Sequence, residues 1–165
     1  MSIKPSILIL FILLTGTIFG QKTFYNTRDE EIKLTKLERT AAMWFDYRTD
    51  STRIDSIVLL SSVPFNWNDD TVFFNKKGLD NKLKEYVNYS PLIDTIFTSD
   101  DSLKKFFTKS VNKNFDIIEI RFYAPNSLRS VTILVAVSPS KNKVIGYFFL
   151  GDLKYRKRYG ITGFH

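Results

Sequence analysis

Three β-rich runs between Phe115 and Leu150 constrain the fold most strongly. They read FDIIEIRFY, SVTILVAVS and KVIGYFFL, and the turn-like connectors APNSLR and PSKNK join them. Runs rich in Ile, Val, Phe and Tyr, punctuated by Pro, Asn and Ser, are typical of an antiparallel meander. The middle run is apolar on both faces, with Leu134 on one face and Val135 on the other. Such a strand needs cover on both sides, so we expect upstream helices to pack on this sheet.

Helical periodicity dominates the chain upstream of these runs. Thr27 and Glu30 have the spacing of a capping box, in which a hydroxyl and a carboxylate satisfy the first free N–H groups of a helix. Apolar and aromatic residues then recur at helical spacing, so the pattern predicts a helix from about Arg28 to Arg48. The other predicted elements are a short helix over 53–62 that Pro64 ends, two strands around a turn in 64–74, a helix over 79–87, a strand over 92–97 and a helix capped by Ser99.

The order of these elements predicts the fold class. Helices come first and most strands come last, and the segment 21–165 shows no internal repeat and no interdomain linker. We therefore expect a single α+β domain, in which N-terminal helices pack on a curved antiparallel sheet formed mostly by the C-terminal half.

The step Val63-Pro64-Phe65, followed by a polar turn and then by Phe73–Tyr86, resembles secreted members of the nuclear-transport-factor-like, cystatin-like superfamily. The three closing strands are similar to that fold as well. The resemblance implies a cystatin-like cone, in which helices pack against a strongly bent sheet and leave a pocket. The superfamily includes isomerases, dehydratases and non-catalytic binding domains, so the resemblance implies no single activity.

Residues 1–20 have the pattern of a secretory signal peptide. Lys4 precedes the unbroken apolar run Ile7–Leu14, and small residues follow up to Gly20. The apolar stretch is shorter than the ~20 residues that a membrane span needs. We expect cleavage near Gly20 and export of the mature chain, either to a periplasm or out of the cell.

The composition excludes several kinds of chemistry. The chain has no cysteine, which excludes disulfides, thiol nucleophiles and Cys-ligated metals. Its single histidine is the last residue, His165, so the chain lacks the histidines that a histidine metal site or a Ser-His-Asp triad would need. We expect no metal and no cofactor. The formal charge of +7 favours anionic partners in general without choosing one.

One candidate ligand site lies on the first run of the meander. Alternation places Glu119, Arg121 and Tyr123 on one face, which we expect to be the concave side of the sheet, where a cone-shaped fold holds a ligand. Glu119 would act as a general base there if burial raised its pKa. The alternative is a surface ion pair between Glu119 and Arg121.

A second candidate site lies at the end of the first predicted helix. Trp44 and Tyr47 crowd this end together with Asp46 and Arg48. Flat rings for a ligand and charged groups that orient it would form the mouth of a pocket. The alternative is that Trp44 belongs to the core and that the others lie on a solvated helix end. Asp46 and Asp94 are further candidates for acid or base catalysis.

The only dense basic run includes Lys154, Arg156 and Arg158, which alternate with Tyr155 and Tyr159. Interleaved cations and rings suit single-stranded nucleic acid, but no nucleic-acid-binding motif accompanies this run, so we expect no nucleic-acid partner. A weak, salt-sensitive contact with an anionic membrane surface fits the run better. The alternative is a solvated edge strand whose cations prevent aggregation.

Three functions of different classes follow from these patterns. In the first, an exported non-catalytic domain binds a small apolar ligand or a protein partner in a pocket of the curved sheet. In the second, a metal-independent isomerase or hydrolase uses Glu119, Asp46 or Asp94 as its acid or base. In the third, an envelope-associated protein is held by its basic C-terminal edge. The lack of cysteine, of a catalytic histidine and of a Gly-rich phosphate loop favours the first function over the second.

Overall fold

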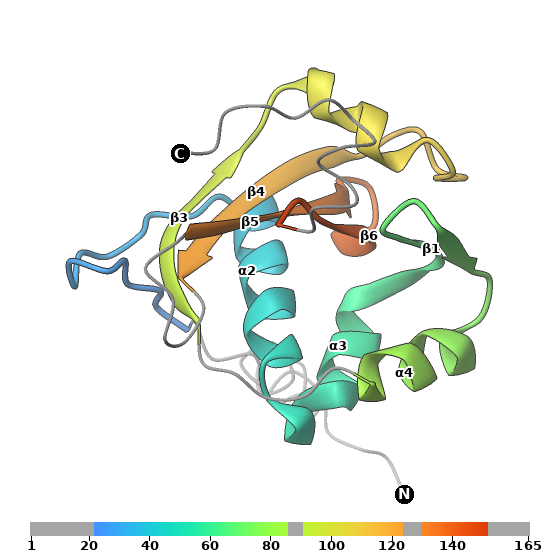
Figure 1. Ribbon diagram of the computed structural model, residues 1–165, viewed down its shortest axis with the longest axis horizontal. Helices are drawn as coiled ribbons and strands as arrows, with labels where there is room; N and C mark the ends of the chain where they lie inside the picture. Colours follow the sequence, from blue (N-terminus) through green and yellow to red (C-terminus); the bar gives the residue numbers. More distant parts are fainter. Residues whose placement is uncertain (1–21, 86–90, 124–129, 152–165) are drawn as a thin grey trace, which may run out of the picture.

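A curved sheet of six strands forms the centre of the computed structural model, which describes residues 22–85, 91–123 and 130–151. The predicted α+β class is confirmed, because helices of the N-terminal half pack against this sheet (Figure 1). The strands are β1 (Ser61–Trp67), β2 (Thr71–Phe73), β3 (Leu92–Thr98), β4 (Asp116–Tyr123), β5 (Ser130–Ser138) and β6 (Lys143–Phe149), in the spatial order β2-β1-β6-β5-β4-β3. The helices are α2 (Lys36–Arg48), α3 (Ile54–Leu60) and α4 (Lys76–Lys84), with the 3-10 helices η1 (Ser51–Arg53) and η2 (Asp101–Phe107).

Two predicted segments fall on parts of the chain that are not described. The signal peptide, residues 1–20, and the basic run with Lys154, Arg156 and Arg158 lie outside the described residues. Among the helices that are described, none is long and apolar enough to span a bilayer.

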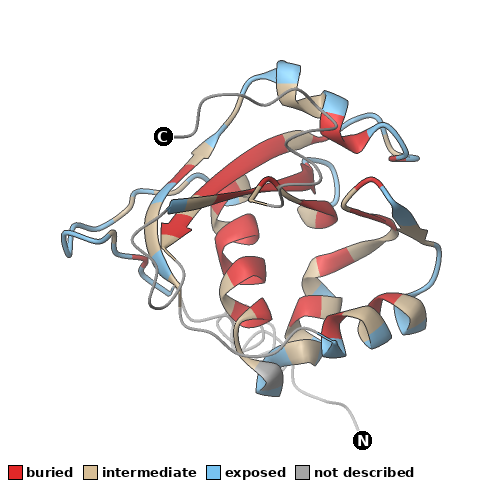
Figure 2. Ribbon diagram, in the orientation of Figure 1, coloured by how far each residue is buried: buried red, intermediate tan, exposed pale blue. Residues whose placement is uncertain are grey.

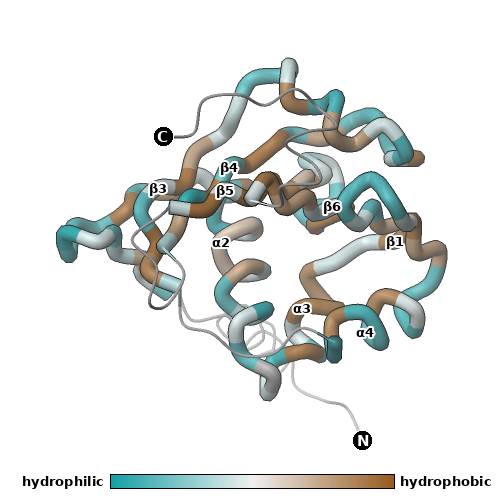
Figure 3. The backbone as a smooth tube through the Cα atoms, viewed as in Figure 1, coloured by the Kyte–Doolittle hydropathy of each residue, from teal (hydrophilic) through white to brown (hydrophobic). Residues whose placement is uncertain are grey.

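The predicted meander is confirmed. β4 pairs with β5 and β5 pairs with β6, both antiparallel, and Leu134 lies between Glu119 and Phe148 in register. Leu134 and Val135 are both fully buried, so β5 is covered on both faces (Figure 2). Figure 3 shows hydrophobic residues along β4, β5 and β6, while the loops at the margin of the molecule are more hydrophilic.

The sheet separates two hydrophobic clusters. The sheet bends around α2, and the larger cluster fills the space between them, with Val135 on the side of β5 that faces α2. The smaller cluster lies on the outer side, where Phe106 and Phe107 of η2 pack with Leu134 and Phe148. Burial of apolar side chains on both faces of the central strands therefore stabilises the packing of α2 on one side of the sheet and of η2 on the other.

The first helix begins later than predicted. α2 starts at Lys36, and the capping box is formed by Thr35 and Glu38 rather than by Thr27 and Glu30. The predicted start is wrong because the Asn26 side chain accepts hydrogen bonds from two backbone N–H groups that follow it, which closes a local turn. A polar side chain that bonds its own backbone in this way competes with helix formation.

Pro64 does not mark the end of the short helix but lies inside β1. α3 ends at Leu60, and β1 then runs parallel to β6, so the sheet is mixed rather than wholly antiparallel. Pro64 costs no ladder bond, because the pairing with β6 shifts register between Ser61 and Asn66 and the pairing with β2 begins at Phe65. Proline within a sheet is confined to such irregular positions.

The helix predicted after Ser99 is a 3-10 helix. Asp100 rather than Ser99 caps it, with its side chain accepting from the backbone N–H of Ser102. Phe107 of η2 is buried, whereas Val111 lies past the end of η2 and is exposed. The capping side chain thus belongs to the residue next to the predicted one.

Candidate functional site

The last turn of α2 buries three of the residues that the sequence places at a pocket mouth. Trp44 is fully buried, and Tyr47 and Arg48 are 8% and 9% exposed. Helical spacing turns Trp44 and Arg48 to the same side, because residues four apart lie one above the other on a helix. A cation in the last turn also interacts favourably with the negative end of the helix dipole.

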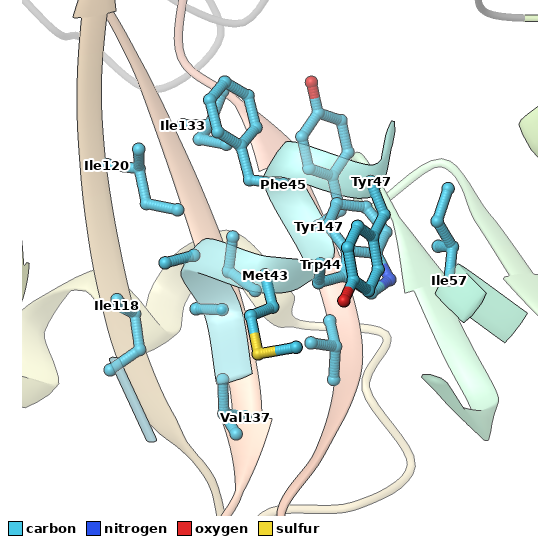
Figure 4. Packing of buried hydrophobic residues seen from close by; sticks show 14 of the residues in the cluster. Met43, Trp44, Phe45, Tyr47, Ile57, Ile118, Ile120, Ile133, Val137 and Tyr147 are labelled. Carbon is cyan, nitrogen blue, oxygen red and sulfur yellow. The ribbon is translucent and has the colours of Figure 1, made fainter. Parts of the chain in front are cut away.

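Aromatic rings from β1 and β6 surround this turn. We call the set the aromatic–arginine cluster; its members are Trp44, Arg48, Phe65, Trp67 and Tyr147. The ring of Trp44 lies 5.6 Å from that of Tyr147 and 5.9 Å from that of Phe65, and the rings of Trp67 and Tyr147 lie 5.1 Å apart. Ring pairs at such distances contribute about 0.5–1.5 kcal/mol each beyond their buried area. Figure 4 shows Trp44 beside Tyr147, and Phe45 pointing towards Ile120 and Ile133.

Arg48 supplies the charge of this cluster. Its guanidinium carbon lies 4.4 Å from the ring centroid of Tyr147 and 5.4 Å from that of Trp67, and its Nη1 donates a hydrogen bond of 3.1 Å to the Tyr147 hydroxyl. A desolvated cation–π contact is worth about 2 kcal/mol, which offsets part of the cost of burying a cation. The rings and the hydroxyl thus hold the guanidinium in one orientation.

Polar contacts hold the Trp44 ring of the cluster in place. The indole N–H of Trp44 donates to the Ser61 hydroxyl at 2.9 Å, and that hydroxyl donates to the carbonyl oxygen of Ile57 at 2.7 Å. These bonds connect α2, α3 and β1 through buried groups. The cluster is therefore preorganised, because its side chains are held by neighbours that are themselves packed.

The structure does not bring Glu119 and Arg121 to this cluster. They lie on the face of β4 that α2 does not cover, the face that carries Ile117 of the smaller cluster. The Glu119 carboxylate accepts from Nε and Nη2 of Arg121, each at 2.9 Å, and the guanidinium of Arg121 lies over the ring of Phe97. Tyr123, on the same face by alternation, is half-buried. The two candidate ligand sites thus lie on opposite faces of the sheet.

The other carboxylates proposed for catalysis are also engaged by partners. Asp46 forms an ion pair of 2.6 Å with Lys22, and Asp94 accepts from the Thr27 hydroxyl at 3.5 Å. Asp46 lies on α2 and Asp94 on β3, whereas Glu119 lies on the outer face of β4. Across the described ranges, no group of three or more His, Asp or Glu side chains is arranged to hold a metal ion.

The turn between β1 and β2 uses its polar side chains for structure. Asn68 and Asp69 adopt positive φ angles of 51° and 54°. Asp69 Oδ1 accepts from the backbone N–H of Lys109 at 2.8 Å, and Asn68 Oδ1 accepts from the backbone N–H of Phe149 at 2.8 Å. This turn therefore fixes the ends of β1 and β6, which carry Trp67 and Tyr147.

Comparison of the sequence with models of protein families and with curated proteins gives no match. The assignment of the site therefore depends on its geometry. Sequence reasoning identified Trp44, Tyr47 and Arg48 but missed Trp67 and Tyr147, which come from segments far away in the chain. An available signal was that both are large aromatic residues in predicted strands that flank polar turns.

Proposed function

We propose that this chain is an exported, non-catalytic domain that binds a small, mostly apolar ligand with an acidic group at the aromatic–arginine cluster. The observation that carries the proposal is the Arg48 guanidinium, 9% exposed and held against the rings of Trp67 and Tyr147. Small-molecule sites are mostly apolar and aromatic, with a few polar groups that orient the ligand.

The chemistry of the cluster defines the ligand class. Flat rings suit a flat or branched apolar body, and a guanidinium matches the two oxygens of a carboxylate or sulfonate. Tyr47 and Arg48 keep small exposed fractions while Trp44 keeps none, so the ligand approaches from the C-terminal end of α2. A non-catalytic role is favoured because Glu119, Asp46 and Asp94 lie on three separate elements and each contacts a neighbouring side chain.

Two dyes with the same rings test this proposal. Anilinonaphthalene sulfonate carries an anionic group, and phenylnaphthylamine has the same ring system without it. We expect the parent protein to bind the sulfonate with saturable fluorescence and to prefer it over the neutral dye by about tenfold or more, the contribution of one charge-assisted contact. In Arg48→Met, which keeps the apolar stem, the preference should disappear.

Arg53→Gln is the matched control, because Arg53 also lies over a ring of this helix end, that of Tyr47, but its side chain is 53% exposed. This variant should keep the preference of the parent protein. Near-ultraviolet circular dichroism must show native packing in each variant, since loosely packed states bind such dyes without specificity. Equal affinity of the parent for both dyes, or an unchanged preference in a folded Arg48→Met, would contradict the proposal.

A further inference from the structure

The connection between β2 and α4 exposes an aromatic ring beside two cations. Phe74 is 70% exposed, the largest value among the large apolar side chains that the structure describes. Asn75, Lys76 and Lys77 follow it and are exposed as well, and this stretch lies at the margin of the molecule (Figure 2). We call residues 74–77 the basic aromatic tip.

The shape of the tip is fixed by the elements on either side. Phe73 pairs with Phe65 across β1 and β2 and packs against the larger cluster, so alternation turns the next residue, Phe74, away from the core. The Asn75 side chain accepts from the backbone N–H of Gly78 at 2.8 Å and caps α4. Phe74 is therefore held in solvent by a well-defined turn.

The two lysines of the tip do not stabilise α4. Lys76 and Lys77 occupy the first turn of α4, where the positive end of the helix dipole disfavours cations. Within the described ranges neither forms an ion pair, whereas Lys82 and Lys84 of the same helix pair with Glu85 and Asp80. Their charges are available to an anionic partner.

We propose that the basic aromatic tip binds the surface of an anionic lipid membrane. Phe74 enters the interface between headgroups and acyl chains, and Lys76 and Lys77 lie among anionic headgroups. A protein partner fits the tip less well, because one ring buries about 150–250 Å², whereas a stable protein interface buries about 800 Å² on each side. A bilayer accepts a single ring, and the result is weak, reversible and salt-sensitive attachment.

Co-sedimentation of the mature full chain with vesicles tests the proposal. Vesicles of phosphatidylcholine with phosphatidylglycerol should retain the protein, and vesicles of phosphatidylcholine alone should not. Phe74→Ser should weaken retention by about tenfold, because the apolar transfer of the ring is lost. The double variant Lys76→Gln/Lys77→Gln should weaken it by about fivefold per lysine at low salt and should reduce its dependence on salt.

Matched controls distinguish binding by the basic aromatic tip from non-specific binding to vesicles. Leu92→Ser removes a side chain of β3 that is also exposed, 65%, and Lys33→Gln/Lys36→Gln removes two exposed lysines elsewhere. Both should behave like the parent chain. All variants should also be compared in a chain with Lys154, Arg156 and Arg158 changed to Gln, so that the contribution of the basic run is subtracted.

The outcomes decide between the tip and other sources of binding. Equal losses in Phe74→Ser and Leu92→Ser, or no loss in either tip variant, would overturn the proposal, as would a lack of retention of the parent chain. A chain with Phe74→Trp should also show a blue shift of tryptophan emission with anionic vesicles that Leu92→Trp does not show. Because the changed residues are exposed, the unfolding midpoint should stay near that of the parent.

Discussion

Glu38 connects α2 to the edge strand β3. Its Oε2 accepts from the backbone N–H of Thr35 at 2.8 Å, and its Oε1 accepts from the backbone N–H and the hydroxyl of Thr98 at 2.8 and 2.9 Å. Burial raises the pKa of the Glu38 carboxyl, but the hydrogen bonds from Thr35 and Thr98 outweigh burial and hold the pKa below its ordinary value. The carboxylate thus accepts hydrogen bonds from a backbone N–H group at the start of α2 and from one on the edge strand β3.

Changing Glu38 to Gln should therefore lower the free energy of unfolding at neutral pH by about 1–3 kcal/mol, the range for hydrogen bonds to a charged group. Because the folded pKa is the lower one, the contribution of Glu38 is present above the unfolded pKa and is lost as pH falls through the folded pKa. Urea unfolding at several pH values should show the difference between Glu38→Gln and the parent shrinking in acid. Glu31→Gln, an exposed carboxylate outside α2, is the control, and an equal loss there would contradict the role of Glu38.

At the scale of the element, β5 is the strand on which both layers depend. Leu134 faces the smaller cluster and Val135 faces the larger one, and neither is exposed to solvent. The strand lies between β4 and β6, so its backbone groups are bonded on both sides. The buried middle of β5 therefore has no face and no edge that tolerates a charge.

Leu134→Asp and Val135→Asp should each lower the free energy of unfolding by several kcal/mol, the scale of an unpaired buried charge. Thermal and urea unfolding of each purified variant measures the loss. Ser130→Asp, at the exposed start of the same strand, should change stability by less than about 0.5 kcal/mol. If one of the two core variants unfolded like the parent, the cover on that face would not contribute to folding.

At the scale of the whole molecule, Gly146 is a position where η2 approaches the sheet closely. A Cβ at this position would lie 2.9 Å from Cε1 of Phe107 and 3.2 Å from the carbonyl oxygen of Asn66. Phe107 belongs to η2 and Asn66 to β1, so one missing side chain lets three elements meet. Glycine is required here for close approach rather than for a special backbone angle.

Gly146→Ala should destabilise the protein by about 1–3 kcal/mol, the usual cost of overpacking a core. Combining it with Phe107→Leu, which makes room for the methyl group, should cost less than the sum of the two single changes. Unfolding measurements of the two single variants and the double variant form a thermodynamic cycle that gives the coupling directly. Simple additivity would show that the Phe107 ring adjusts freely and that η2 is not held by this contact.

The sequence by itself determined the elements whose signals are local and periodic. Alternation and β-branched residues specified the meander β4–β5–β6, and an apolar middle run specified that both faces of β5 are buried. Helical spacing also placed Trp44 and Arg48 on one side of α2, where they meet in the aromatic–arginine cluster. These features follow from the period of two residues in a strand and of 3.6 residues in a helix, both of which are visible in the sequence.

Only the tertiary structure decided which distant segments complete the site. The parallel pairing of β1 with β6 joins residues that lie far apart in the chain, and nothing local encodes such a pairing. Strict alternation along β6 would put Tyr147 on the same face as Ile145, yet Tyr147 belongs to the larger cluster and Ile145 to the smaller one. The reason is the register shift opposite Ala136 and Val137, which inserts Ile145 as an extra residue and reverses the faces beyond it. That bulge brings the Tyr147 ring to Arg48, because an extra residue in a strand changes the direction of every side chain that follows.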